Sequence, residues 1–314
     1  MTDSVTNSNE IIEQDTIVQP EVNKAVWAAC DTFRGVISAD TYKDFVLTML
    51  FLKYISDVYR DEYNRLTEQY GDNPDLINAM MGKQRFVLPT GTSFWDLHEQ
   101  RHQAGNGQRI DQALHAIEEA NGGKLKNVFQ DIMFNTDKLG PEKQKNELLR
   151  HLLEDFAKAT LDFRPSRIGG LDVIGNAYEY LIKHFAAGSG RSAGEFYTPP
   201  EVSDLLAAVL DPQEGDQICD PACGSGSLLM KCGAIVRKNS GSKKYALFGQ
   251  EAIGSTWALA KMNMFLHGED NHRIEWGDTI RNPLLKDKDG LGLLHFDVVT
   301  ANPPFSLEKW GFED

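Results

Sequence analysis

The last third of the chain alternates short apolar runs with segments of helical periodicity, and this alternation limits the possible folds more than any other feature. The apolar runs predict strands at 216–220, 245–250, 273–276 and 296–300, and the periodic segments predict helices at 228–236 and 256–266. Strands separated by helices pair in parallel, because each helix carries the chain back along the sheet. The sequence therefore predicts an α/β fold with a doubly wound, Rossmann-like parallel sheet.

The part of the chain before this sheet shows only helical periodicity. Apolar side chains recur every three or four residues, as in Phe45, Met49 and Leu52, and glycines mark the predicted helix ends. Residues 72–107 contain several Gly and Pro and are predicted to form an irregular but ordered segment. We predict three regions: a disordered tail over 1–19, a helical domain over 20–165 and an α/β domain over 166–314.

Composition narrows the class of protein. The net charge of −14 argues against a surface that binds nucleic acid throughout, although it allows a local basic groove or a basic partner. The four cysteines form no C-x-x-C pair, which favours the reducing cytoplasm and no structural metal. The polar N-terminus predicts no targeting peptide. The most apolar run, 46–55, is too short to span a membrane.

A glycine-rich turn follows the first predicted strand and opens a helix, with the sequence Asp220-Pro221-Ala222-Cys223-Gly224-Ser225-Gly226. Gly224 and Gly226 allow the backbone to approach a ligand closely, and the helix start offers free N–H groups. Glu251 ends the next strand, 25 residues after Gly226 (251 − 226), where folds of this class hold a ribose diol. Asp278 ends the third strand. Acids at three successive strand ends suit an adenosine-bearing cofactor; the alternative is that each only caps its strand.

The chemistry of this turn separates two kinds of cofactor. A nicotinamide dinucleotide favours G-x-G-x-x-G, but no glycine stands three positions after Gly226. Asp220 would repel a pyrophosphate and would attract an ammonium or sulfonium group. S-adenosylmethionine carries both of these cations and no phosphate, so the turn favours this cofactor. Cys223 is not predicted to be a nucleophile, because the cofactor turn offers it no attack geometry.

The fourth predicted strand stops abruptly at Asn302-Pro303-Pro304-Phe305. The prolines allow neither a continuing strand nor an immediate helix, so Asn302 is held at the carboxyl end of the strand. Ligands of open α/β sheets bind at this edge. Asn302 is therefore a candidate for contact with a polar substrate, and the aromatic ring of Phe305 follows three residues later.

A further segment of interest precedes the sheet. Residues 188–194 are mostly small, which is typical either of a mobile loop at the mouth of a site or of a domain linker. Thr198 is then predicted to be the N-cap, and Pro199 the first residue, of a helix that continues over 201–210.

These motifs together resemble a known family. Glu195-Phe196-Tyr197-Thr198-Pro199, the glycine turn, Glu251 and Asn302-Pro303-Pro304-Phe305 look like the amino-methyltransferases that modify N6 of adenine in DNA. With the helical region included, residues 20–314 resemble the modification subunit of type I restriction–modification systems. The resemblance implies a Rossmann-like methyltransferase sheet, site-specific methylation of DNA adenine, and S-adenosyl-L-methionine as cofactor. It also implies a hetero-oligomer in which two modification subunits join one specificity subunit, together with the restriction endonuclease subunit.

The resemblance also assigns roles to residues. Asn302 and Pro303 would accept the N–H bonds of the target amine, Pro304 completes the motif, and Phe305 would stack on a base flipped from the duplex. The cofactor pocket would contain Glu195, Phe196, Tyr197, Thr198, Pro199, Pro200, Asp220, Gly224, Ser225, Gly226, Ser227, Glu251 and Asp278. Within this set, the glycine turn would lie under the methionine part, Glu251 would hold the ribose and Asp278 would approach the adenine.

The sequence departs from the family at its C-terminus. Phe305 stands nine residues before the end (314 − 305), and the family's sheet has more strands than the four predicted here. We therefore expect the C-terminal part of the methyltransferase domain to be missing. Two alternatives stay open: an assembly subunit that binds the cofactor without activity of its own, and an amino-methyltransferase that acts on protein or RNA.

Overall fold

Four parallel strands form the sheet in the last third of the chain. The computed structural model describes residues 18–71, 73–168, 172–188 and 197–305. The strands are β1 (Gln217–Asp220), β2 (Ala246–Glu251), β3 (His272–Trp276) and β4 (Val298–Val299), and their order across the sheet is β3-β2-β1-β4. Each neighbouring pair in this order is parallel. The prediction of a doubly wound, Rossmann-like α/β fold is confirmed.

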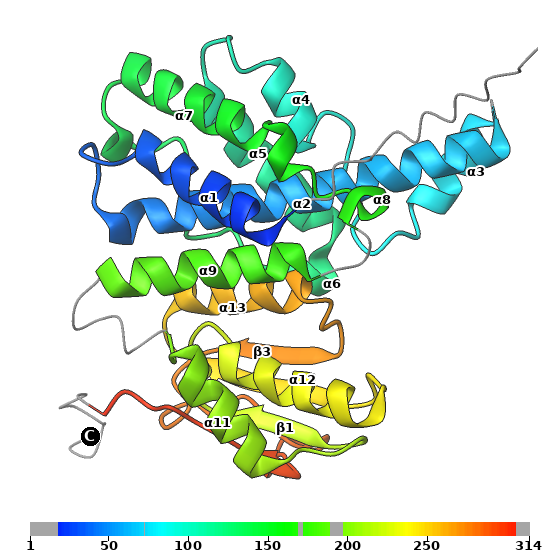
Figure 1. Ribbon diagram of the computed structural model, residues 1–314, viewed down its shortest axis with the longest axis vertical. Coiled ribbons are helices and arrows are strands. Elements are labelled where there is room, and N and C mark those ends of the chain that lie inside the picture. Colours follow the sequence, from blue (N-terminus) through cyan, green and yellow to red (C-terminus); the bar gives the residue numbers. More distant parts are fainter. Residues whose placement is uncertain (1–17, 72, 169–171, 189–196, 306–314) are drawn as a thin grey trace, which may run out of the picture.

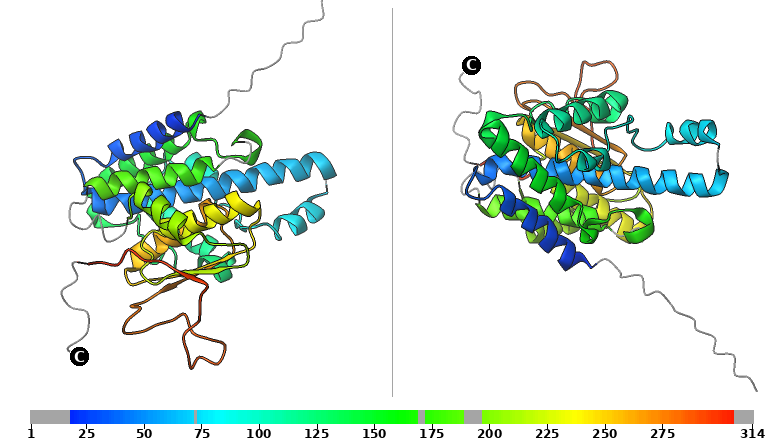
Figure 2. Two further views of the ribbon diagram at one scale, coloured as in Figure 1. Left: turned by 60° about the horizontal axis from the view of Figure 1, so that its bottom comes forward. Right: turned by 90° about the horizontal axis from the view of Figure 1, so that it is seen from above.

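The strand order places a switch point between β1 and β4. The chain moves from β1 outward to β3 and then crosses to the other side of β1 to form β4. Right-handed crossovers therefore put helices α12 (Ser227–Ser240) and α13 (Gly254–Leu266) on one face and the connection 277–297 on the other. Figure 2 shows this connection, in brown, on the side away from the helices. There Phe296 contacts Phe248 of β2, with ring centroids 5.1 Å apart.

The helical region covers the helix face of the sheet as a second layer (Figure 1). Its elements include α1 (Gln19–Ala29), α2 (Ala39–Tyr70), α3 (Pro74–Met81), α4 (Phe94–Glu99), α5 (Asn106–Ala120), α6 (Gly122–Leu125), α7 (Glu142–Phe156), α8 (Pro165–Ile168) and α9 (Val173–Gly188). α2 and α9 pack on each other and on α13. Among the described helices, none has the length and apolar content that a membrane span requires.

One apolar core runs without a break from α1 through α9 and α13 to the strands. The limits 20–165 and 166–314 for two domains therefore stay a proposal, because the two parts bury side chains in common. The tail predicted to be disordered lies outside the described residues as far as residue 17, and α1 already begins at Gln19. The segment of small residues, 189–194, also lies outside the described part of the chain.

Residues 72–107 contain more helix than the sequence predicts. α3 begins behind Asn73, whose side chain accepts the Leu76 N–H at 3.2 Å. α4 begins behind Ser93, which forms a capping box with Asp96. The prediction of an irregular segment is wrong, because helices this short are fixed by their caps and show little apolar periodicity. The prediction that the segment is ordered is confirmed by the complete burial of Phe94.

Candidate ligand site at the switch point

A cavity opens at the carboxyl ends of β1 and β4, at the switch point of the sheet. Its lining residues come from three separate segments: Tyr197 and Thr198 before α11 (Pro200–Leu210), the stretch within 220–228 after β1, and Asn302 after β4. It holds about 260 Å³ of empty space, part of it open to solvent. Open α/β sheets bind their ligands at this position. The structure thus brings the glycine turn and the Asn-Pro-Pro motif together at one site.

Hydrogen bonds donated by its backbone N–H groups hold the glycine turn in place. The Gly224 N–H donates to the Glu251 carboxylate at 3.0 Å, and the Gly226 N–H donates to the Cys223 carbonyl at 2.8 Å. Gly226 precedes α12 with φ of 78°, a left-handed conformation that any other L residue would adopt with strain. Burial raises the pKa of the Cys223 thiol well above its usual value, so this cysteine stays protonated.

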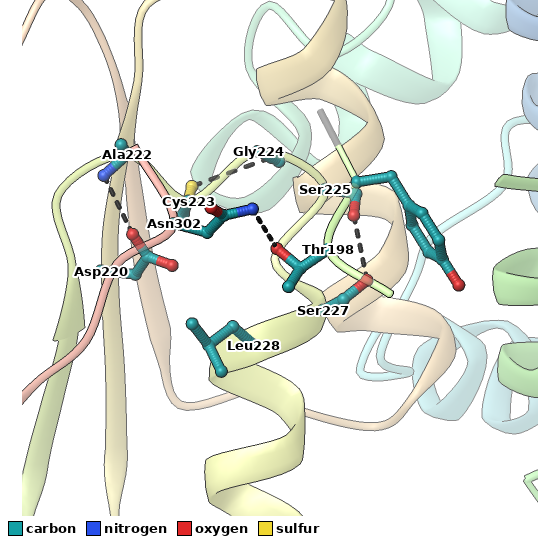
Figure 3. Close-up of a pocket in the computed structure, with 10 residues that line it drawn as sticks. Thr198, Asp220, Ala222, Cys223, Gly224, Ser225, Ser227, Leu228 and Asn302 are labelled. Atoms are coloured by element: carbon teal, nitrogen blue, oxygen red, sulfur yellow. Dashed lines mark hydrogen bonds between the residues drawn. The ribbon is translucent and has the colours of Figure 1, made fainter. Parts of the chain in front are cut away.

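Asp220 is the acid of the cavity. Its side chain is 2% exposed, and one carboxylate oxygen accepts the Ala222 N–H at 3.0 Å. The other oxygen points into the cavity (Figure 3). Burial raises the pKa of Asp220 to about 7, and the nearby Glu251 charge adds to the increase. The carboxyl group therefore titrates near neutral pH, and a cation in the cavity would favour its ionised form.

Asn302 contacts Thr198 across the cavity. The Asn302 Nδ2 donates to the Thr198 Oγ1 at 3.2 Å, and Figure 3 shows the amide nitrogen directed at the hydroxyl. The prediction that Thr198 caps the following helix is wrong. The N-cap is Pro199 and the helix begins at Pro200, so the Thr198 hydroxyl points to Asn302 rather than to the helix.

Some of the remaining predicted residues line the cavity and others do not. Ser225 and Ser227 line the cavity, and their hydroxyl oxygens are 3.0 Å apart. Glu251 lies behind the turn, where its carboxylate accepts the Gly224 and Ile253 N–H groups. Burial raises the pKa of Glu251. Pro199, Pro200, Gly226, Pro303, Pro304 and Phe305 do not line the cavity, and Phe305 is 79% exposed. Glu195 and Phe196 lie outside the described residues.

Asp278 is not brought to the cavity. Its carboxylate accepts the N–H groups of Ile280 and Arg281 at 2.9 and 3.0 Å, and the Arg281 N–H is the largest cause of its lowered pKa. This is the local role that the sequence left open as the alternative, a cap at a strand end.

Three side chains that the sequence analysis did not single out support the site. Asn263 of α13 donates to the Ser225 carbonyl at 3.0 Å. Thr279 donates to the Pro221 carbonyl at 2.5 Å. Gln250 donates to the Gly277 and Asn282 carbonyls at 3.0 and 2.9 Å and so fixes the segment after β3. Asn263 and Gln250 are fully buried polar residues in apolar segments, and that contrast is the signal that could have identified them.

The fold and the cavity define a Rossmann-like α/β protein with a candidate ligand site at its switch point, and comparison with known proteins points to a family. Residues 170–314 match the model of the N-6 DNA Methylase family, and residues 22–156 match that of the HsdM N-terminal domain. Residues 170–314 therefore belong to the N-6 DNA methylase family, and the chain as a whole is similar to the methylase subunits of type I restriction–modification systems.

Several relatives show the same relationship over most of the chain. The MpnII methylase subunit of Mycoplasma pneumoniae is 29% identical over 92% of this chain and 59% of its own length. The MjaIX methylase subunit of Methanocaldococcus jannaschii is 27% identical over 96% of this chain and 54% of its own length. The chain therefore spans a little over half the length of these two relatives.

Solved structures agree with this assignment. The methyltransferase subunit of a type I system from Streptococcus thermophilus superposes with a TM-score of 0.77 at 28% identity, over 91% of this chain and 63% of that one. A modification subunit of a putative type I enzyme from Vibrio vulnificus has a TM-score of 0.55 at 18% identity, over 92% of this chain and 61% of that one. The second comparison supports the fold alone.

Proposed function

We propose that this protein methylates N6 of adenine in DNA, with S-adenosylmethionine as the methyl donor, as the modification subunit of a type I restriction–modification complex. The observation that carries the proposal is the meeting of two motifs in one cavity. The buried acid Asp220 and the glycine turn come from the end of β1, and Asn302 comes from the end of β4. The family implies both the reaction class and the methyl donor.

The chemistry of the cavity fits this cofactor. The described lining residues include one carboxylate, from Asp220, and no Lys, Arg or His. An acid without a basic partner disfavours a phosphate and favours a cationic group. The carboxylate oxygen that points into the cavity can accept a hydrogen bond from an ammonium group, and the hydroxyls of Ser225 and Ser227 can bind polar atoms nearby. S-adenosylmethionine, when bound, supplies an electrophilic methyl group on a sulfonium centre.

Asn302 would prepare the nucleophile. The exocyclic amine of adenine is a poor nucleophile, because its lone pair is delocalised into the ring. The Asn302 side-chain carbonyl and the Pro303 backbone carbonyl can accept its two N–H bonds, which shifts the nitrogen toward a tetrahedral geometry and orients it. The alkylated nitrogen is positively charged and gives up a proton readily, so the site requires no strong base. Phe305, which is exposed, can stack on the flipped base.

We infer that the partners are DNA, a specificity subunit and the restriction subunit of the same system. The chain's net charge of −14 opposes tight binding to DNA by this chain alone, since phosphate neutralisation dominates such binding. A specificity subunit would supply the sequence recognition and the phosphate contacts. The ratio of two modification subunits to one specificity subunit belongs to the same proposal.

The test combines cofactor binding with methyl transfer. Calorimetry with S-adenosylmethionine on the folded chain should show one site. Transfer of labelled methyl groups to DNA should then be measured with and without a co-expressed specificity subunit, and it should require that subunit. Binding without transfer under both conditions would favour an assembly subunit without activity. Transfer to protein or RNA but not to DNA would favour the other amino-methyltransferase class. Absence of binding would contradict the proposal as a whole.

A further inference from the structure

Two segments with the same pattern, a polar residue followed by two prolines, meet in the cavity. Thr198-Pro199-Pro200 and Asn302-Pro303-Pro304 each place one polar side chain directly before two prolines. Although Thr198 and Asn302 are 104 positions apart, their side chains form a hydrogen bond of 3.2 Å. Both residues line the cavity.

The two prolines explain why these side chains are free to reach each other. A residue before proline is held in an extended conformation, so the backbone at both corners is stiff. Asn and Thr commonly bond to backbone N–H groups one or two positions ahead, but proline has no N–H. Both side chains are therefore directed to distant partners, and each corner presents one polar group in a restricted orientation.

The direction of this hydrogen bond determines what the Asn302 amide presents to a substrate. An amide has one accepting end and one donating end, and rotation by 180° exchanges them. The Nδ2 group donates to Thr198, and Figure 3 shows the carbonyl end pointing away from it. An accepting carbonyl suits an amine N–H, whereas a rotated amide would place its NH₂ group against the amine.

We propose that Thr198 is a positioning residue that holds the Asn302 amide in the orientation required for methyl transfer, an inference that rests on the proposed function. Thr198 accepts from Nδ2 and so leaves Oδ1 for the target amine. Loss of the Thr198 hydroxyl leaves the amide free to rotate. The expected effect is therefore on the rate of transfer when the cofactor is saturating.

Thr198→Val and Thr198→Ser form the test pair. Valine keeps the shape and removes the hydroxyl, whereas serine keeps the hydroxyl. In the complex with the specificity subunit and DNA, T198V should lower the single-turnover methyl-transfer rate about 10- to 100-fold, the range seen when a partner that orients a site group is lost. The rate of T198S should stay within about threefold of that of the unchanged protein, because serine retains the hydroxyl. Both rates are measured at saturating S-adenosylmethionine, because Thr198 also lines the predicted cofactor cavity.

The control is Thr67→Val, the same substitution at an exposed hydroxyl on α2 that bonds to the Tyr63 carbonyl. It should leave the rate unchanged. Equal losses in T198V and T198S would indicate a packing role and overturn the inference. A weakened cofactor affinity in T198V, with the rate restored at saturation, would place Thr198 on the cofactor instead and would also overturn it.

A second measurement does not depend on activity. In side-chain amide NMR spectra, the Asn302 NH₂ signal is identified by its loss in Asn302→Asp. T198V should shift the hydrogen-bonded proton of this signal, and T198S should preserve it. A signal that T198V does not shift would contradict the hydrogen bond even if the chain transfers no methyl group. Failure of the proposed function would appear separately, as absence of transfer in the unchanged protein.

Discussion

The two walls of the cavity differ in how the chain supports them. The wall at the end of β1 is buried: Asp220, Cys223 and Ser225 are no more than 5% exposed, and the glycine turn is bonded to β2 and α13. The wall after β4 is more open: Asn302, which lines the cavity, is partly exposed, and its neighbours outside the lining, Val299 and Phe305, are 56% and 79% exposed. Both walls lie at the ends of parallel strands of one sheet, but among the described strands β1 pairs with both β2 and β4, whereas β4 pairs with β1 alone.

This difference suggests that the two walls have separate roles, one in binding the cofactor and one in contacting the substrate. The buried wall is organised by the chain's own contacts, as expected of a site that must be formed before its ligand arrives. The wall after β4 carries the amide of Asn302, with the aromatic ring of Phe305 three residues further on, the two side chains that the proposed function assigns to the target base. Substitutions in the buried wall should therefore change affinity and stability, whereas substitutions in the open wall should change the rate of transfer.

The largest expected effect comes from Asn302→Ala. Removal of the acceptor should reduce methyl transfer at least about 10³-fold, comparable to the loss of a key hydrogen-bonding group at other active sites. Cofactor affinity should stay within about twofold, because only the open wall is altered. Single-turnover rates and calorimetry on the same preparation measure both quantities. A large loss of cofactor affinity in this variant would contradict the proposal that the two walls have separate roles.

Asp220→Asn should act on binding. Loss of the charge that faces a cation should weaken S-adenosylmethionine by about 10- to 100-fold, equivalent to one charged hydrogen bond. Because the pKa of Asp220 is about 7 in the free protein, cofactor binding at pH 7 should release part of a proton, and the variant should release less. Calorimetry in buffers of different ionisation enthalpy measures this release. Asp289→Asn, at an exposed position, is the matched control for the change in net charge.

Asp220→Asn should weaken cofactor binding but increase the stability of the folded chain. The pKa of Asp220 in the folded chain, about 7, lies above the 3.8 of an aspartate in water, so the folded chain binds more protons between these values. This contribution to stability is greatest below about pH 4 and is lost as the pH rises to about 7. At pH 8 Asp220→Asn should therefore raise the unfolding free energy of the cofactor-free chain by on the order of 3 kcal/mol. Denaturant melts at pH 5 and pH 8 should show this gain mainly at pH 8. An equal gain in unfolding free energy at both pH values would contradict a raised pKa of Asp220.

The smallest effect is expected from Phe305→Ala. Because the ring is 79% exposed, stability should change by less than about 0.5 kcal/mol. Stacking on a base is worth about 1–3 kcal/mol, so kcat/KM for DNA should fall roughly 5- to 100-fold. Phe305→Tyr keeps an aromatic face and should retain most of the activity. If alanine and tyrosine behave alike, the ring does not stack on the target base.

The sequence predicts the parts of the site that local patterns determine. The strand ends, the glycine turn and the Asn302 corner follow from short runs of residue types, and the parallel order places them at one edge. The Thr198–Asn302 contact could not be predicted, because it joins segments 104 positions apart. The position of the helix start also depended on context: a threonine before two prolines resembles an N-cap, but in the structure the cap is Pro199. The contacts of Gln250 could not be predicted either, because this buried side chain bonds to the backbone of a loop that follows the next strand.

The most direct test of the central claim, that Asn302 beside the β1 turn directs a methyl group to N6 of adenine, is product analysis of DNA by mass spectrometry. The chain, the specificity subunit and DNA are incubated with S-adenosylmethionine that carries a deuterated methyl group. We expect labelled N6-methyladenine with the unchanged chain and at most about a thousandth as much with Asn302→Ala, although the two bind the cofactor to within about twofold. Label on another base, or similar amounts of labelled N6-methyladenine from the alanine variant, would contradict the central claim.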